Sequence, residues 1–290
     1  MAPVRDASPA DLLEAWLARQ LGAAEREWLD GAIGGAGESD RGLFMAVSFV
    51  QRKLGKADLA LTPEDRAAAE TARPGWDPSD WSVDQAARVL LLLRAGGTGD
   101  AFAAQLRTLF STADVAETIA FLRGLPLYPD PERHVMRARE GARSNMRPVF
   151  EAVAHRSPYP MERFDENAWN HMVLKALFVG AALHPIEGLE ARANPELARI
   201  LRDYAHERWA AGRPVTPEFW RGVGRFVDAG ALADLERVLS SGAALEREGA
   251  ALALADCPRP EAKALLGAVP DLEAAIGRGD LTWPGLGRTL

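Results

Sequence analysis

The chain has 290 residues, of which 48% are hydrophobic and 26% are charged. This composition excludes an intrinsically disordered chain and is typical of a globular protein with a substantial core. The 41 acidic and 34 basic residues give a net charge of −7. This charge argues against sequence-independent binding to nucleic acid and against docking on anionic membranes.

The predicted compartment is the cytoplasm. The N-terminal residues lack the apolar region of a signal peptide, and the apolar runs are shorter than the roughly 20 residues that a spanning helix needs. We therefore expect no insertion into a membrane. The single cysteine, Cys257, excludes an intrachain disulfide and stands far in sequence from every histidine, so it is not expected to act as a nucleophile.

The first predicted helix begins after Ser8-Pro9, because a capping serine followed by proline is a helix start. A second helix is predicted over residues 41–53, and Thr62-Pro63 opens a third. The glycine-rich residues 31–37 are expected to form a flexible loop, and the Pro and Gly content of residues 73–78 predicts another loop.

Further helices are predicted over residues 82–94, 99–111, 114–123 and 131–144. No segment shows strand alternation bounded by hairpin turns, which predicts an all-α fold. A weak internal similarity relates residues 106–132 to residues 235–261, as two copies of a helix–turn–helix pattern. It favours stacked antiparallel helix pairs in a HEAT-like or α-solenoid-like array. The alternative is a chance resemblance between helices rich in Ala, Leu and Arg.

Three residue types suited to directed polar chemistry are concentrated between residues 128 and 209. All histidines, asparagines and tyrosines of the chain lie there. Asparagine and tyrosine make directed hydrogen bonds, and histidine can ligate a metal or titrate near neutral pH. The segment is therefore predicted to carry a functional site, with simple surface exposure as the alternative.

The helix predicted after Asp165 carries a polar stripe. Asn167, His171 and Lys175 follow one another at i, i+4 and i+8, with Asn170 beside them. Lys175 is set among apolar neighbours, so it either extends to water or meets a charged partner or ligand.

A second polar group consists of Asp203, His206 and Glu207, which share a helical face. Acid-x-x-His is a spacing of metal sites in helical bundles, but such sites need a second copy. Glu151 and His155, at i and i+4, could be a partner pair, but they are not a clean second copy of the spacing. No metal is therefore expected. A buried hydrogen-bond network is the simpler interpretation of His206 and Glu207.

The third group consists of Arg143, Arg147 and His134, which could form an anion-binding cluster. The alternative is a solvated helix face. No phosphate-binding loop, Rossmann fingerprint, zinc motif or nucleophile elbow occurs in the chain. No cofactor is therefore predicted.

Several of these segments together resemble the EboA family. The resemblance rests on residues 143–146, 149–152, 158–160, 164–165, 168–178 and 203–213. His171 stands where the family pattern leads us to expect glutamine, which weakens it as an essential ligand. Together with the internal similarity, the resemblance leads us to expect three segments within one continuous α-helical domain. These are an N-terminal helical region (1–124), the EboA-like core with the candidate site (125–228), and a C-terminal HEAT-like hairpin and tail (229–290).

The resemblance also implies a bacterial setting. Such proteins belong to a gene cluster that encodes a UbiA-like prenyltransferase, a TatD-like hydrolase, a cyclase resembling dehydroquinate synthase and a sugar-isomerase-like protein. The cluster is linked to making a small secondary metabolite or moving it to the periplasm. The biochemical role of this component is not assigned by the resemblance.

We expect an accessory protein that binds a polar or anionic small molecule, or a pathway partner, in a helical groove. The candidate ligand contacts share polar or charged side chains in the functional segment: Asn145, Asn170, Lys175, His206, Glu207, Arg208, Arg143 and His134. The partner is expected to be the metabolite or another protein of the cluster.

Two alternatives remain open. In the first, the chain is a pathway enzyme with His206 as general acid or base, tuned by Glu207 or Asp203, and Lys175 as an electrophile or amine nucleophile. In the second, it is a helical scaffold that docks the other proteins of the cluster. Convergence of the candidate side chains in one pocket would favour a ligand-binding protein or an enzyme over a scaffold.

Overall fold

The computed structural model describes residues 7–289, which form helices joined by loops and turns and one isolated β-bridge between Asp58 and Ser82. The predicted all-α fold class is confirmed. The chain divides into two compact units, Met1–Phe164 and Asp165–Leu290. The three-segment division made from the sequence stays a prediction.

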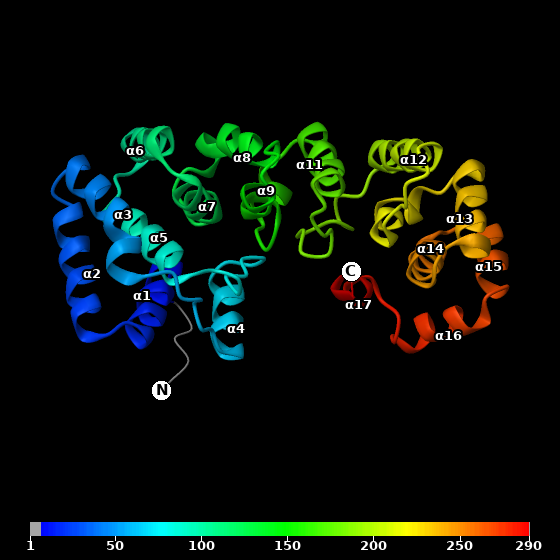
Figure 1. The fold of residues 1–290 in the computed structure, drawn as a ribbon, viewed down its shortest axis with the longest axis horizontal. Coiled ribbons are helices and arrows are strands. Elements are labelled where there is room, and N and C mark those ends of the chain that lie inside the picture. The colour runs from blue at the N-terminus through cyan, green and yellow to red at the C-terminus, as the bar shows by residue number, and fades with distance from the viewer. Residues whose placement is uncertain (1–6, 290) are drawn as a thin grey trace. The chain divides into compact units, whose positions relative to one another are not determined.

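Among its described residues, 7–164, the first unit holds ten α-helices and one 3₁₀ helix (Figure 1), with these bounds: α1 Pro9–Gln20, α2 Ala23–Ala36, α3 Asp40–Leu54, α4 Pro63–Ala72, α5 Val83–Ala95, α6 Gly99–Thr112, α7 Val115–Arg123, η1 Pro131–His134, α8 Val135–Ala142, α9 Arg147–Ala154 and α10 Tyr159–Arg163. The predicted helix starts are confirmed. The side chain of Ser8 accepts a hydrogen bond from the backbone of Asp11, and Thr62 caps α4 in the same way.

Helix α5 is the centre of the first unit. Its residues from Val89 to Leu92 are fully buried, and it packs against α1, α2, α3 and α7. A helix that is apolar on nearly every side is stable only when other helices cover it. The strongly apolar sequence after Ser82 therefore fixed its place in the core.

The expected loop over residues 31–37 is wrong for most of its length, because α2 continues to Ala36. Helical glycine costs about 1 kcal/mol relative to alanine, and packing can outweigh this cost. Here α2 packs on α3 so closely that a Cβ on Gly42 would lie 2.6 Å from the backbone oxygen of Gly35. Tertiary contact therefore overrides the local preference.

The second unit contains these elements: α11 Glu166–Val179, α12 Pro195–Ala210, η2 Pro217–Gly222, η3 Gly224–Phe226, α13 Ala229–Ser241, α14 Ala244–Asp256, α15 Pro260–Gly267, α16 Pro270–Arg278 and α17 Trp283–Thr289. Helix α14 is its centre, with residues 249–254 buried against η2, α13, α15 and α17. The approach to η2 requires glycine, because a Cβ on Gly249 would lie 2.6 Å from the carbonyl oxygen of Pro217.

The two segments related by internal similarity are both helix pairs, α6–α7 and α13–α14. Their arrangement in a HEAT-like or solenoid-like array stays a prediction. Over residues 7–289, no helix combines the length and the apolar character needed to cross a membrane.

Candidate functional site

The second unit contains a pocket of about 350 Å³ between the end of α12, the following loop and α13. Its lining combines two tryptophans, two arginines and a glutamate with small or apolar residues: Trp209, Gly212, Arg213, Pro214, Val215, Trp220, Arg237, Val238, Ser241, Gly242 and Glu246. We call it the tryptophan pocket.

The wall of the tryptophan pocket is held by the C-terminal cap of α12. Gly212 adopts a positive φ of 64°, a conformation that favours glycine. The backbone N–H of Arg213 then donates to the carbonyl of Arg208 at 2.8 Å, which ends the helix in a Schellman-type turn. The side chain of Arg208 donates from Nε to the carbonyl of Pro214 at 2.7 Å. The loop is therefore fixed before any ligand arrives.

Two indoles and a guanidinium form the aromatic part of the pocket. The rings of Trp209 and Trp220 lie 5.9 Å apart, and the guanidinium carbon of Arg237 lies 4.4 Å from the ring centroid of Trp209. Arg237 is exposed, whereas Trp220 is buried. Stacking on an indole orients a guanidinium and leaves its N–H groups able to meet an anion.

His206 extends this stack. Its ring lies 5.5 Å from that of Trp209 at an interplanar angle of 28°. Its Nε2 lies 2.9 Å from both carboxylate oxygens of Asp234, which also accepts from Nε of Arg202 at 2.6 Å. Because of this hydrogen bond, the pKa of Arg202 is raised above its ordinary value. Asp234 thus ties α12 to α13 beside the tryptophan pocket.

A second pocket of about 370 Å³ adjoins the first. The two share Pro214, Val215 and Glu246. The remaining lining of the second is Arg208, Thr216, Pro217, Ala243 and Leu245. We call it the leucine pocket. Oε2 of Glu246 accepts from the backbone of Ala243 at 2.8 Å, so this shared carboxylate is engaged in capping α14.

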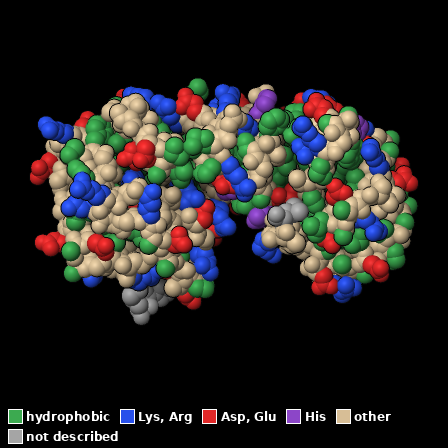
Figure 2. Space-filling model, in the orientation of Figure 1, with side chains coloured by type: hydrophobic (Ala, Val, Ile, Leu, Met, Phe, Trp, Pro, Cys, Tyr) green, Lys and Arg blue, Asp and Glu red, His purple; other side chains and the backbone are tan. Residues whose placement is uncertain are grey.

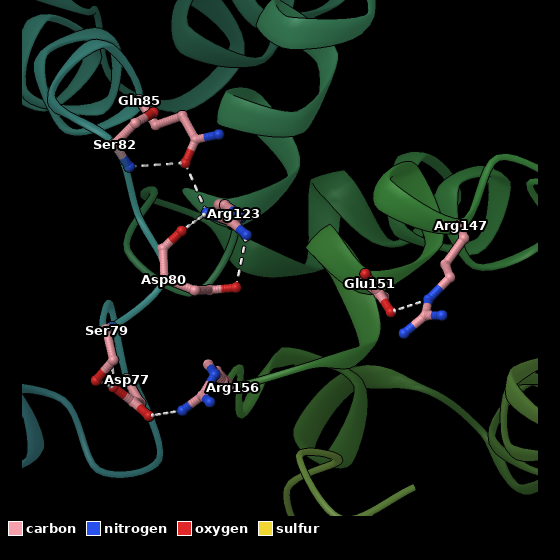
Figure 3. Close-up of polar contacts among 9 residues, drawn as sticks. All are labelled: Asp77, Ser79, Asp80, Ser82, Gln85, Arg123, Arg147, Glu151 and Arg156. Carbon is pink, nitrogen blue, oxygen red and sulfur yellow. Dashed lines mark hydrogen bonds and ion pairs between the residues drawn. The ribbon is translucent and has the colours of Figure 1, made fainter. Parts of the chain in front are cut away.

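In the first unit, arginine side chains instead form ion pairs and hydrogen bonds with carboxylates (Figure 3). Arg123, at the end of α7, donates to the backbone and side chain of Asp80 at 2.7 and 2.6 Å and to Gln85 at 2.6 Å. Burial lowers the pKa of Arg123, with a further contribution from the charge of Arg156. Arg123 thereby joins the loop before α5 to α7.

Arg156 completes this network from the residues that follow α9. It has a positive φ of 54°, which is strained for a residue other than glycine. Asp77 holds it on both sides, donating its N–H to the carbonyl of Arg156 at 3.1 Å and accepting from the guanidinium. Burial alone would raise the pKa of Asp77, but hydrogen bonds from Ser79 and the charge of Arg156 hold it below its ordinary value.

The predicted anion cluster of Arg143, Arg147 and His134 is spread over several environments. Arg143 is exposed at the end of α8, and Nε of Arg147 donates to Glu151 at 2.6 Å within α9. His134 is buried, its Nε2 donates to the carbonyl of Pro129 at 3.0 Å, and its ring lies edge-on to Phe102. Burial lowers its pKa. Asn145 is exposed just before α9.

Asn170 and Lys175 lie on α11 in the second unit. The side-chain amides of Asn170 and Asn194 hydrogen-bond reciprocally, at 2.8 and 3.2 Å. Asn194 also caps α12 by accepting from the backbone of Leu197 at 2.8 Å. Nζ of the half-buried Lys175 lies 5.7 Å from the ring centroid of Phe178. Asn170 therefore joins α11 to the start of α12.

Of the predicted ligand contacts, His206 and Arg208 lie at the pockets. His206 stacks on Trp209, which lines the tryptophan pocket, and Arg208 lines the leucine pocket. Glu207 lies between them in sequence and is exposed. The sequence interpretation missed Trp209, Trp220 and Arg237. The sequence did contain a signal for Trp209, because this residue belongs to the segment 203–213 that carries the family resemblance.

Charges of both signs are interspersed on the face of the molecule shown in Figure 2. Across residues 7–289, no group of three or more His, Cys, Asp or Glu side chains is placed to hold a metal ion. The acid-x-x-His spacing of Asp203 and His206 instead leads to two separate contacts. Asp203 pairs with Arg199 at 2.6 Å, while His206 pairs with Asp234.

Comparison with known proteins gives one positive finding. The model of a family described as metabolite traffic protein EboA matches residues 9–224. No curated protein and no solved structure matches the chain. The match begins at the first residue of α1 and ends at Gly224, just after η2, so it covers Trp209, Arg213 and Trp220 but not Arg237.

Proposed function

Because the chain belongs to the EboA family of metabolite traffic proteins, we propose that it binds a small anionic metabolite in the tryptophan pocket. It acts as an accessory protein that holds this molecule during its production or export. The family description supports a role in metabolite traffic. The pocket suggests the part of the chain that carries it.

The observation that carries this proposal is the meeting of indoles and guanidiniums around one cavity. A volume of about 350 Å³ lies within the range of roughly 300–1,000 Å³ that is typical of ligand pockets. The ring of Trp209, with the buried Trp220 behind it, offers apolar surface to a planar group, and Arg213 and Arg237 offer positive charge to an anion. A planar anion therefore matches both parts of the lining.

The enzyme alternative rests on the contact between His206 and Asp234. A carboxylate that binds one ring nitrogen of histidine fixes the orientation of the ring, as in general acid–base catalysis. This pair lies against Trp209 at the edge of the pocket. The binding role is preferred because the same contact also joins α12 to α13.

The test is native mass spectrometry of the freshly purified chain, followed by titration with 8-anilinonaphthalene-1-sulfonate, an aromatic anion. We expect saturable binding that falls at least tenfold in both variants. Arg237→Gln loses a hydrogen bond to a charged group, which contributes about 1.5–3 kcal/mol, and Trp209→Ala loses the burial of an aromatic face, which contributes about as much. The matched control is Arg247→Gln, which removes an exposed arginine of α14 that does not line the pocket.

Binding that is equal in all variants would place the site elsewhere and overturn the proposal. Extra mass retained in the native state would identify the natural ligand, and the same two variants should lose it. For the enzyme alternative, His206→Gln would abolish turnover of that ligand, whereas a binding protein would retain it unchanged.

A further inference from the structure

The tryptophan and leucine pockets adjoin each other, and we call the two together the groove. They share Pro214, Val215 and Glu246, so the same residues wall both cavities. Val215 is buried at 3% exposure, and the Schellman-type turn after α12 fixes the loop that carries it. The two cavities therefore meet along this part of the loop and at Glu246.

The two pockets differ in chemistry. The unshared lining of the tryptophan pocket includes Arg213, Arg237 and the hydroxyl of Ser241. The unshared lining of the leucine pocket includes Pro217, Ala243 and Leu245. Its arginine, Arg208, has Nε hydrogen-bonded to Pro214 at 2.7 Å and a guanidinium carbon 6.0 Å from the ring centroid of Tyr204. The unshared lining thus supplies two arginines to the tryptophan pocket and one to the leucine pocket, where Nε of that arginine is already bound within the loop.

We infer that the ligand is an amphiphile. Its anionic head and planar part occupy the tryptophan pocket, and an apolar chain or ring system extends over Pro217 and Leu245 in the leucine pocket. This inference rests on the proposed function and adds the substrate class. A purely polar anion would leave the apolar surface of the leucine pocket in water, and a purely apolar molecule would leave Arg213 and Arg237 without a counterion.

Pro217 also links the groove to the core of the unit. Gly249 of α14 packs against Pro217 so closely that a Cβ there would clash with its carbonyl oxygen. The floor of the leucine pocket therefore rests on the central helix. A rigid apolar floor binds extra methylene groups without first having to order itself.

The experiment uses benzoate, 4-butylbenzoate and 4-hexylbenzoate with the full chain, measured by isothermal titration calorimetry. Each methylene buried in the leucine pocket should tighten binding by about fourfold, the factor that corresponds to about 0.8 kcal/mol. Leu245→Ser should remove most of this gain and leave the affinity for benzoate unchanged. Arg237→Gln should weaken all compounds by the same factor, and Arg247→Gln should change none.

The outcomes separate the two proposals. If benzoate binds in an Arg237-dependent way but the longer compounds bind no more tightly, the amphiphile is wrong and the tryptophan pocket stands. If none of the compounds binds, and 8-anilinonaphthalene-1-sulfonate does not bind either, the proposed function fails.

A gain with chain length that Leu245→Ser leaves intact would place the chain elsewhere, for example in the apolar groove of Trp28, Met45 and Phe49 between α2 and α3. That result would also overturn the inference. Thermal unfolding of each variant checks that the unit remains folded. Leu245→Ala serves as a second, milder substitution if the serine variant is unstable.

Discussion

Two sets of arginines, one in each unit, use the guanidinium in opposite ways. In the first unit, Arg123 pairs with Asp80, Arg156 pairs with Asp77, and Arg88 is buried against Asp84. In the second, Arg237 lies on an indole at the edge of a cavity. A guanidinium whose N–H groups are used by neighbouring residues holds elements together, whereas one that is stacked and exposed remains able to bind a ligand.

The largest expected effect concerns the arginines of the first unit that pair with carboxylates. Asp84→Asn removes the charge opposite Arg88, whose side chain is 2% exposed. The hydroxyl of Ser82, which donates to Asp84 at 2.5 Å, still finds a polar partner in the asparagine. A buried charge without its partner destabilises the fold by about 3–5 kcal/mol. Chemical denaturation measures the loss. The double variant Arg88→Met/Asp84→Leu should recover most of it, and a loss in the single variant below about 1 kcal/mol would contradict a buried pair.

The next effect concerns a residue that was predicted from sequence to contact the ligand. Asn170→Ala should destabilise the second unit by about 1–3 kcal/mol, because it removes both hydrogen bonds between the buried Asn170 and the half-buried Asn194. Binding of 8-anilinonaphthalene-1-sulfonate should remain unchanged. Unaltered stability together with lost binding would instead support the role predicted from sequence. Urea denaturation and the titration described above distinguish these outcomes.

A smaller effect is expected from pH. Burial lowers the pKa of His134, so the folded state favours the neutral ring. The stabilisation is complete above pH 6.5, the ordinary value for histidine, and is lost as the pH falls further. Thermal unfolding at pH 7.5 and 5.5 should show a decrease in stability that is smaller in His134→Gln, which keeps a donor for Pro129. An equal decrease in both proteins would show that His134 does not contribute.

The smallest effect is expected at Lys175. Its ammonium group lies near the exposed ring of Phe178, a contact that contributes about 0.5–1 kcal/mol at most in an exposed position. Lys175→Met should change the free energy of unfolding by less than about 0.5 kcal/mol, because methionine keeps the apolar stem in place. Loss of ligand binding or of turnover in this variant would show that Lys175 contacts the ligand or takes part in the reaction.

Local signals predicted much of the fold. Ser8, Thr62 and Asp165 each cap a helix as their positions suggested. The error at residues 31–37 arose because a glycine-rich helix is stabilised by its contact with α3, which the local sequence does not contain. Sequence spacing placed His206 and Glu207 on α12, but it could not show that His206 meets Asp234 and Trp209.

The sequence by itself determined the helices, their caps, the apolar face of α5 and the resemblance to the EboA family. These features depend on neighbours within a few residues or on residue identity alone. Only the tertiary structure decided which arginines pair with carboxylates and which stay available beside a cavity. The partners of Arg123 and Arg237 come from other helices, and helical spacing fixes a residue's face but not what packs against it.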